Sequence, residues 1–138
     1  MEQSILKSVK KVLHIGDDDP SFDEDILLHI NSAFSTLNDL GIGPAGGYFI
    51  EDDTAEWGDY LDLEDDLIHV HRVKTVIYLS VRLVFDPPAT TFALNAAQEN
   101  LREQMWRLNV RREETAWVDP NPSNIPEEVD GVLDGGTV

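Results

Sequence analysis

Residues 21–40 read SFDEDILLHINSAFSTLNDL and carry the clearest secondary-structure signal in the chain. Ser21, with Glu24 three residues later, has the pattern of a helix capping box, and the acids of this first turn suit the positive end of a helix dipole. Apolar residues then recur at spacings of three and four, and Gly41 is typical of a helix end. We therefore predict a helix over Ser21–Leu40 with one buried stripe, made of Ile26, Leu27, Ile30, Ala33, Phe34, Leu37 and Leu40.

Two further helices are predicted on either side of this one. Ser4–Ile15 has apolar residues near helical spacing, and we expect Gly16 to end that short helix. Leu67–Phe85 is rich in β-branched residues, which favours a strand, but it runs for nineteen residues without a turn signal. Its apolar residues also recur at three and four, so we predict a helix there. The expected stripe is Val70, Val73, Ile77, Val81 and Val84.

A stiff break separates that helix from the last one. Phe85-Asp86-Pro87-Pro88 contains two prolines, which lack a backbone donor and disfavour helix at the preceding residue. We expect Thr91 to cap a long helix over Phe92–Val110. Its expected stripe is Leu94, Ala97, Leu101, Met105 and Leu108. The fold class is thus mainly α: a small bundle of about four helices with an irregular acidic loop and an extended C-terminal tail.

Gly41–Leu63 is the irregular part of the chain, because glycines and a proline crowd its start. Tyr48-Phe49-Ile50 within it suits either a short strand or a buried anchor. Trp57 and Tyr60 lie among acids. A stretch of this length without regular structure is usually functional or flexible. Its aromatic residues are candidates both for packing onto the core and for contact with a partner, and the sequence leaves that choice open.

The composition indicates one soluble, intracellular domain. The chain has 138 residues, enough for a core, and no cysteine, so disulfides and thiolate zinc sites are excluded. Its N-terminus lacks the apolar run of a signal peptide, and charges interrupt every apolar stretch, so we expect no membrane span.

Negative charge dominates the chain, whose formal net charge is −17. A field of this sign repels nucleic-acid phosphate, so specific DNA or RNA binding is not expected. Glu51–Asp66 holds nine acids and no base, and Glu113–Val138 holds seven acids and no base. The latter segment also contains three prolines and cannot form a core of its own. We therefore divide the chain into a helical domain, 1–112, and an extended acidic tail, 113–138.

A search for catalytic or metal-binding patterns finds none, so we expect no enzyme and no cofactor. His69 and His71 are two residues apart, which places them on different faces of a helix, where they do not chelate one metal. Asp17-Asp18-Asp19 is similar to the start of a calcium loop, but the positions that require glycine and glutamate hold Phe22 and Leu28. No phosphate-binding loop and no nucleophile elbow is present.

Two stretches carry a resemblance to a known family. Residues 5–44 read ILKSVKKVLHIGDDDPSFDEDILLHINSAFSTLNDLGIGP, and residues 73–110 read VKTVIYLSVRLVFDPPATTFALNAAQENLREQMWRLNV. The INSAFSTLNDLGIGP ending, the VKTVIYLSVRLVFDPP helix with its break, and the EQMWRLNV closing segment together resemble the head–tail connector (head-tail adaptor) proteins of long-tailed bacteriophages. The resemblance covers about the first four-fifths of the chain, and the tail is not part of it.

The resemblance implies a structural subunit of the virion, assembled in the host cytoplasm. It implies a ring of about twelve copies below the portal protein, contact with a downstream neck or tail-completion protein, and a channel through which genomic DNA passes without specific binding. Two other classes stay open: an acidic DNA mimic that inhibits a nucleic-acid enzyme, and a small metal-dependent hydrolase with paired carboxylates.

Three sets of residues are the candidate contact sites, and none is catalytic or metal-binding. We expect the tail segment Asp119–Val138 to be disordered in the free subunit and to become ordered against the portal or an adjacent subunit. The loop is expected to meet a neighbouring subunit or the neck, and the break to set the shape shown to ring neighbours. The residues are Asp119, Pro120, Pro122, Ile125, Pro126, Val129, Val132 and Leu133 in the tail; Tyr48, Phe49, Ile50, Trp57 and Tyr60 in the loop; and Phe85, Asp86, Pro87 and Pro88 in the break.

Overall fold

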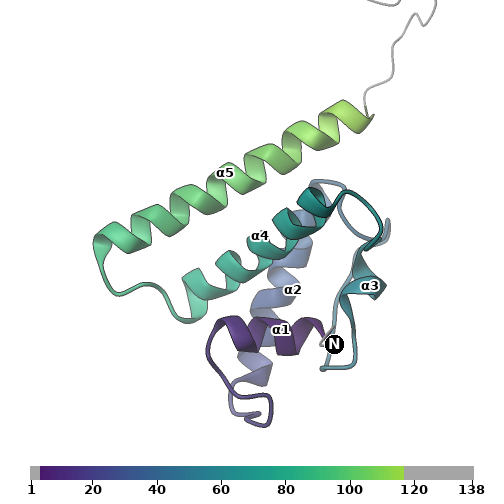
Figure 1. Ribbon diagram of the computed structural model, residues 1–138. Coiled ribbons are helices and arrows are strands. Elements are labelled where there is room, and N and C mark those ends of the chain that lie inside the picture. The colour runs from purple at the N-terminus through teal and green to yellow at the C-terminus, as the bar shows by residue number, and fades with distance from the viewer. Residues whose placement is uncertain (1–3, 117–138) are drawn as a thin grey trace, which may run out of the picture.

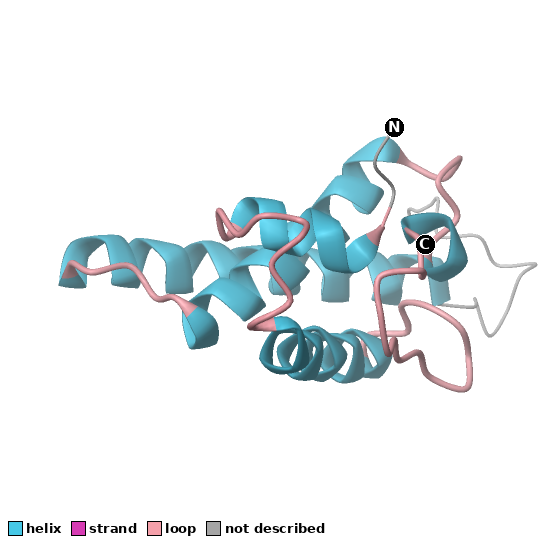
Figure 2. Ribbon diagram, turned by 90° about the horizontal axis from the view of Figure 1, so that it is seen from below, coloured by secondary structure: helices cyan, strands magenta, loops and turns pink. Residues whose placement is uncertain are grey.

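The computed structural model describes residues 4–116, and these fold into a mainly helical bundle, as predicted (Figures 1 and 2). Helix α4 packs against α2 on one side and α5 on the other, and α1 lies across α2 and α4. No strand occurs in this range; Ser4 and Glu56 form one isolated bridge. The helices are α1 (Ile5–Val12), α2 (Asp23–Asp39), α3 (Trp57–Tyr60), α4 (Leu67–Phe85) and α5 (Thr91–Ala116).

The core lies where α1, α2 and α4 meet. The predicted stripe of α2 is confirmed, since Phe34 is 1% exposed and its companions at helical spacing are buried or half-buried. The stripe of α4 is confirmed except at Val84, which is 63% exposed, because the last turn of α4 is at the surface. Helix α5 is peripheral. Of its expected stripe only Leu108 is buried, whereas Leu94, Ala97, Leu101 and Met105 are half-buried.

The predicted N-terminus of α2 is wrong by two residues, although its C-terminus is confirmed. Ser21 does not cap the helix, because its backbone N–H donates to the Asp19 carboxylate at 3.0 Å and the chain turns there first. The helix begins at Asp23, with Phe22 at the cap position. At the other end Gly41 has φ 77° and its N–H donates to the Asn38 carbonyl, which closes the helix as expected.

Helix α1 ends four residues before Gly16, the predicted stop. The chain leaves the helix at His14, which adopts φ 64°. The Ile15 N–H then donates to the Lys10 carbonyl at 2.8 Å, the pattern of a Schellman motif. A histidine thus occupies a left-handed position that glycine usually fills, and sequence rules that look for glycine place the end too late.

The bounds of α5 also differ from the prediction at both ends. The cap is Thr90 and not Thr91, because the Thr90 hydroxyl oxygen accepts from the Ala93 N–H at 3.1 Å. The helix continues to Ala116, six residues past the predicted Val110, so the first four residues assigned to the extended tail are helical. Residues 117–138 lie outside the described part of the chain.

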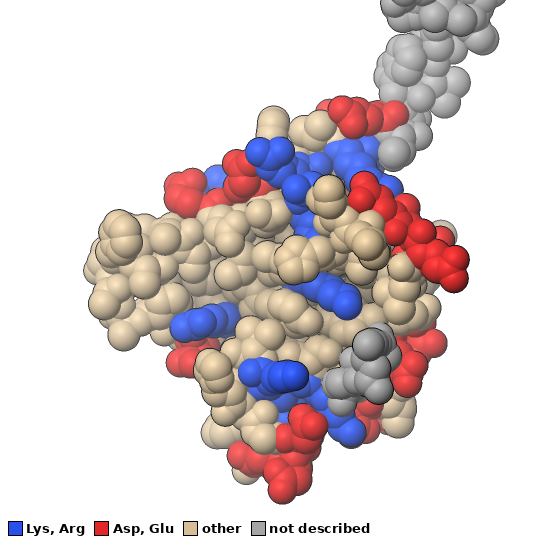
Figure 3. Space-filling model, in the orientation of Figure 1, with Lys and Arg blue, Asp and Glu red and all other residues tan. Residues whose placement is uncertain are grey.

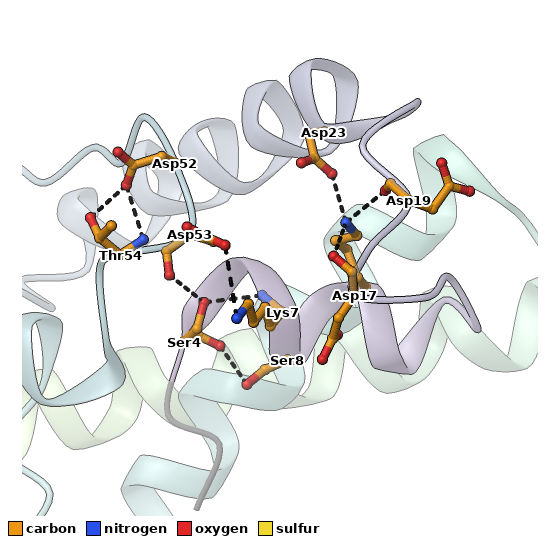
Figure 4. A network of polar contacts seen from close by, with 10 residues as sticks. Ser4, Lys7, Ser8, Asp17, Asp19, Asp23, Asp52, Asp53 and Thr54 are labelled. Carbon is orange, nitrogen blue, oxygen red and sulfur yellow. Dashed lines mark hydrogen bonds and ion pairs between the residues drawn. The ribbon is translucent and has the colours of Figure 1, made fainter.

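The irregular loop contains α3 and is tied to α1. No strand forms at Tyr48–Ile50; the Asn31 amide instead accepts from the Ile50 N–H at 2.9 Å and donates to its carbonyl at 3.0 Å. Further along, the Ser4 hydroxyl donates to the Asp53 carbonyl (Figure 4). The indole N–H of Trp57 donates to the Ser8 hydroxyl. The loop is therefore an ordered layer on α1 and α2.

A buried lysine ties α1 to the turn that leads into α2. The Lys10 side chain is 2% exposed, and its ammonium lies 2.9 Å from the Asp23 carboxylate. It also donates to the backbone carbonyls of Asp19 at 2.8 Å and Asp17 at 3.4 Å, so the aspartate turn wraps the ammonium (Figure 4). The turn whose sequence is similar to a calcium loop thus binds the chain's own cation.

Replacing this lysine tests how much the α1–α2 junction depends on it. Lys10→Met keeps the length of the side chain but leaves two backbone carbonyls without their donor and the Asp23 carboxylate without its counter-ion, so we expect the free energy of unfolding to fall by about 2–4 kcal/mol. Chemical denaturation measures this. Lys11→Met is the matched control, since Lys11 is exposed and should change stability by less than about 0.5 kcal/mol. Equal effects of the two substitutions on the free energy of unfolding would contradict a stabilising role of Lys10 at the α1–α2 junction.

Candidate functional site

The predicted break between the last two helices is present. Helix α4 ends at Phe85 and α5 starts at Thr91. The Phe85 ring packs edge-on against Phe22 at 5.4 Å, which fixes the end of α4 to the start of α2. Asp86 and Pro87 are exposed, and Pro88 is half-buried. The break therefore sets the path from α4 into α5, while its contact with a ring neighbour stays a prediction.

An uncharged surface surrounds this break. Residues 83–98, here named the uncharged corner, contain a single charged residue, Asp86. Val84 is 63% exposed and Phe92 is 85% exposed. Figure 3 shows the corner as the uncharged projection at the left of the molecule, in contrast to the mixed charges elsewhere on that face. The break residues 85–88, predicted as a contact site from the sequence, lie within the corner, but no sequence pattern predicted the wider surface. The signal for it is a run of sixteen residues with one charge in a chain of which 27% of residues are charged.

The aromatic residues of the loop divide into core and surface. Trp57 and Tyr60 are buried, and Tyr60 stacks on Tyr48 at 5.1 Å and lies 4.5 Å from the Phe34 ring. Ile50 is also buried, whereas Phe49 is 65% exposed. Four of the five candidate contact residues thus pack within the subunit, and Phe49 presents the most surface to another protein. Contact with a neighbour or the neck stays a prediction.

The C-terminal half of α5 borders a cleft of about 300 Å³, here named the α5 cleft. It brings together the end of α2, the residues that follow α3 and the start of α4. Figure 3 shows basic side chains gathered over this half of α5, next to acids of the loop. The polar residues that line the cleft are Tyr60, Asp62, Asp65, His69, Arg111 and Arg112, and its apolar lining includes Leu40, Ile42, Leu61, Val70 and Leu108.

The ionisable residues of the α5 cleft fall into two groups: Asp65 and Arg111 at its entrance, here named the mouth, and the buried Tyr60 and His69, here named the floor. At the mouth, the Arg111 guanidinium lies 3.3 Å from the Asp65 carboxylate. The Asp66 N–H that donates to Asp65, helped by Arg111, lowers the pKa of the Asp65 carboxyl. On the floor, burial lowers the pKa of His69 and raises the pKa of the Tyr60 hydroxyl, so both side chains are held in their neutral forms.

The histidine pair does not form a metal site. His69 is buried and His71 is exposed, which confirms that the two lie on different faces of α4. Among residues 4–116 no group of three or more histidine, cysteine, aspartate or glutamate side chains is placed to hold a metal ion. In the same range no helix is long and apolar enough to cross a membrane. The tail candidates from Asp119 to Leu133 lie outside the described residues.

The fold and its surfaces define a helical subunit with an uncharged corner at one end of α5 and a charged cleft at the other. Residues 5–115 match the model of a family described as phage connector protein. The chain therefore belongs to the phage connector protein family, as its resemblance to head–tail connectors indicated, and has a structural role as a connector component of a phage virion. Association with other virion components follows from this membership, and such structural families are typically not enzymes. No curated protein and no solved structure matches the chain.

The buried histidine predicts a pH dependence of stability. Burial comes first among the causes that lower the pKa of His69, with Arg111 and Arg72 adding to it and Asp65 and Asp66 opposing it. The unfolded chain then binds a proton more readily, so the stability that neutral His69 supplies is fully present above pH 6.5 and is lost as the pH falls towards its folded pKa. We expect the free energy of unfolding to decrease between about pH 7.5 and pH 5.5.

Urea unfolding across that range measures the effect. His69→Gln should flatten the pH dependence, because glutamine does not titrate. His71→Gln is the matched control and should keep the slope of the unchanged protein, since His71 is exposed on the opposite face of α4. If the free energy of unfolding of His69→Gln still falls with pH as steeply as that of the unchanged protein, another group causes the pH dependence.

Proposed function

We propose that this chain is a head-to-tail adaptor whose copies form a ring of about twelve beneath the portal protein and join the capsid to the tail. Genomic DNA passes through the ring, and a downstream neck or tail-completion protein binds its far side. The family membership supports this proposal over an acidic DNA mimic or a hydrolase. Helix α5 ends at Ala116, and we propose that the acidic residues 117–138, named here the acidic arm, act as a separate contact segment.

The observation that carries the proposal is the uncharged corner. A closed ring needs two different faces on each subunit that meet and repeat by rotation. The corner supplies one such face, because exposed Phe92 and Val84 lie in a surface with one charge in sixteen residues, in a chain where 27% of residues are charged. Interfaces are depleted in charge at their centre and enriched in aromatic residues. We infer that the corner packs against the next subunit.

Net charge supports passage of DNA through the ring. With a formal net charge of −17, a ring of such subunits has a strongly negative field, which repels the DNA phosphates. Repulsion of this kind prevents adhesion between the duplex and the ring, so the DNA slides. Which acids face the channel depends on the arrangement of subunits in the ring.

A charge placed in the corner tests the ring contact. Phe92→Glu should leave the fold intact, because the side chain is 85% exposed, yet lower the incorporation of subunits into tail-less, DNA-filled heads by about tenfold or more. Circular dichroism checks the fold, and bound subunits are counted after purification of the heads. Leu67→Glu is the matched control: it makes a similar change at a residue 75% exposed at the other end of α4, and should join heads normally. Normal joining by Phe92→Glu would remove the support for this contact.

The acidic arm is proposed to bind the portal or an adjacent subunit. About a dozen copies in one ring offset the low affinity expected of each extended arm. Removal of residues 117–138 should leave the helical signal unchanged, because the described core ends before them, but should abolish addition to tail-less heads. A chain with the same residues shuffled over 117–138 keeps the charge and length and should also fail. If the truncated subunits join as well as the full chain, the contact lies in the helical body.

A further inference from the structure

Two residues that line the α5 cleft each have a buried polar atom with no hydrogen-bond partner among the described residues. These are the hydroxyl of Tyr60 and Nδ1 of His69, on side chains from residues 4% and 9% exposed. Buried polar atoms are almost always paired, and an unpaired one calls for an explanation. Two unpaired atoms in one cleft indicate a site for a polar ligand.

The chemistry of the cleft selects a carboxylate. A neutral tyrosine hydroxyl donates a hydrogen bond, and so does Nδ1 of neutral histidine when it carries the proton. Arg111 and Arg112 line the same cleft and attract an anion. Two acids share the mouth with these arginines: Asp65 forms an ion pair with Arg111, and the Asp62 carboxylate accepts from the Glu64 N–H at 3.0 Å. The two arginines balance these two acids in charge, and the donors on the floor are then available to an incoming carboxylate. An acidic peptide segment therefore complements this site.

Such a segment begins beside the cleft. Helix α5 ends at Ala116, about 8 Å along its axis from the cleft residue Arg111. The chain that follows, 117–138, has twenty-two residues, five acids and no base. When extended it spans more than about 70 Å, enough to turn back into the cleft. Because it is tethered this close, its effective concentration at the site is on the order of millimolar.

We propose that in the free subunit the α5 cleft binds a carboxylate of its own acidic segment, 117–138. Tyr60 and His69 on the floor donate hydrogen bonds to that carboxylate, and the arginines at the mouth hold the neighbouring acids. Where the segment also binds the portal or a neighbour, as proposed above, the cleft competes for it and holds it back until assembly. The docking itself does not depend on the ring.

The absence of cysteine makes a direct test possible. A nitroxide is attached to ¹⁵N-labelled full-length protein at Ser123→Cys or, separately, at Thr137→Cys. We expect at least one label to reduce the amide signals of the cleft residues Gly43, Leu61 and Val70 by more than twofold, relative to Gly16 near the start of α2. A mixture of ¹⁵N-labelled, label-free protein with unlabelled, nitroxide-bearing protein should show no such loss, because docking occurs within one chain.

Two substitutions link the effect to the cleft. Tyr60→Phe removes only the unpaired hydroxyl, and His69→Phe removes Nδ1, so each should restore the cleft signals at least twofold. His71→Phe, on the opposite face of α4, should not. The proposal is overturned if neither label affects the cleft, if the loss occurs only in the mixture, or if Tyr60→Phe leaves the loss unchanged. These outcomes are independent of head joining, so a failure here leaves the adaptor proposal standing, and a failure to join heads leaves the docking result standing.

Discussion

Burial of one face of α2 against α4 determines where the rest of the molecule lies. Phe34 is at the centre of that face, and its ring also meets Tyr48 and Tyr60, so the same side chain that joins two helices positions the loop. Aromatic packing of this kind combines a large buried area with preferred ring geometry. Because the Tyr60 ring packs against the rings of Phe34 and Tyr48, the position of its hydroxyl in the α5 cleft is fixed. The core and the candidate binding site are therefore one continuous packing arrangement.

The acids of the loop have local structural roles besides their contribution to net charge. The Asp52 carboxylate accepts from the backbone N–H and hydroxyl of Thr54, and Asp66 accepts from the Ile68 N–H and caps α4. The hydrogen bonds with Thr54 lower the pKa of the exposed Asp52 carboxyl, and this effect exceeds the opposing effect of desolvation. Acidic side chains satisfy the backbone at turns and helix starts, where water would otherwise do so. A highly negative sequence and an ordered loop are consequently compatible.

Sequence periodicity predicted the long helices because their apolar stripes extend over several turns. It failed where a single local contact decides the outcome. Asp19 binds the Ser21 N–H and prevents the predicted cap, and His14 adopts a conformation expected of glycine. The α5 cleft was beyond the reach of sequence patterns, because Tyr60, His69 and Arg111 come from three separate elements. The resemblance of the long helices to head–tail connectors, in contrast, was sufficient to indicate the family.

The shallow burial of α5 gives the subunit a mechanical property. Over residues 91–114 of this 26-residue helix, where side-chain burial is described, Leu108 alone is buried, and Phe92 lies about 24 Å away from it along the axis. Residues 91–107 of α5 contain no buried side chain, although half-buried Leu101 and Met105 pack against the core. A tilt of about 10° about Leu108 would move Phe92 by about 4 Å but those two side chains by less than about 2 Å. The uncharged corner is thus the part of α5 whose position changes most for a given rotation of the helix.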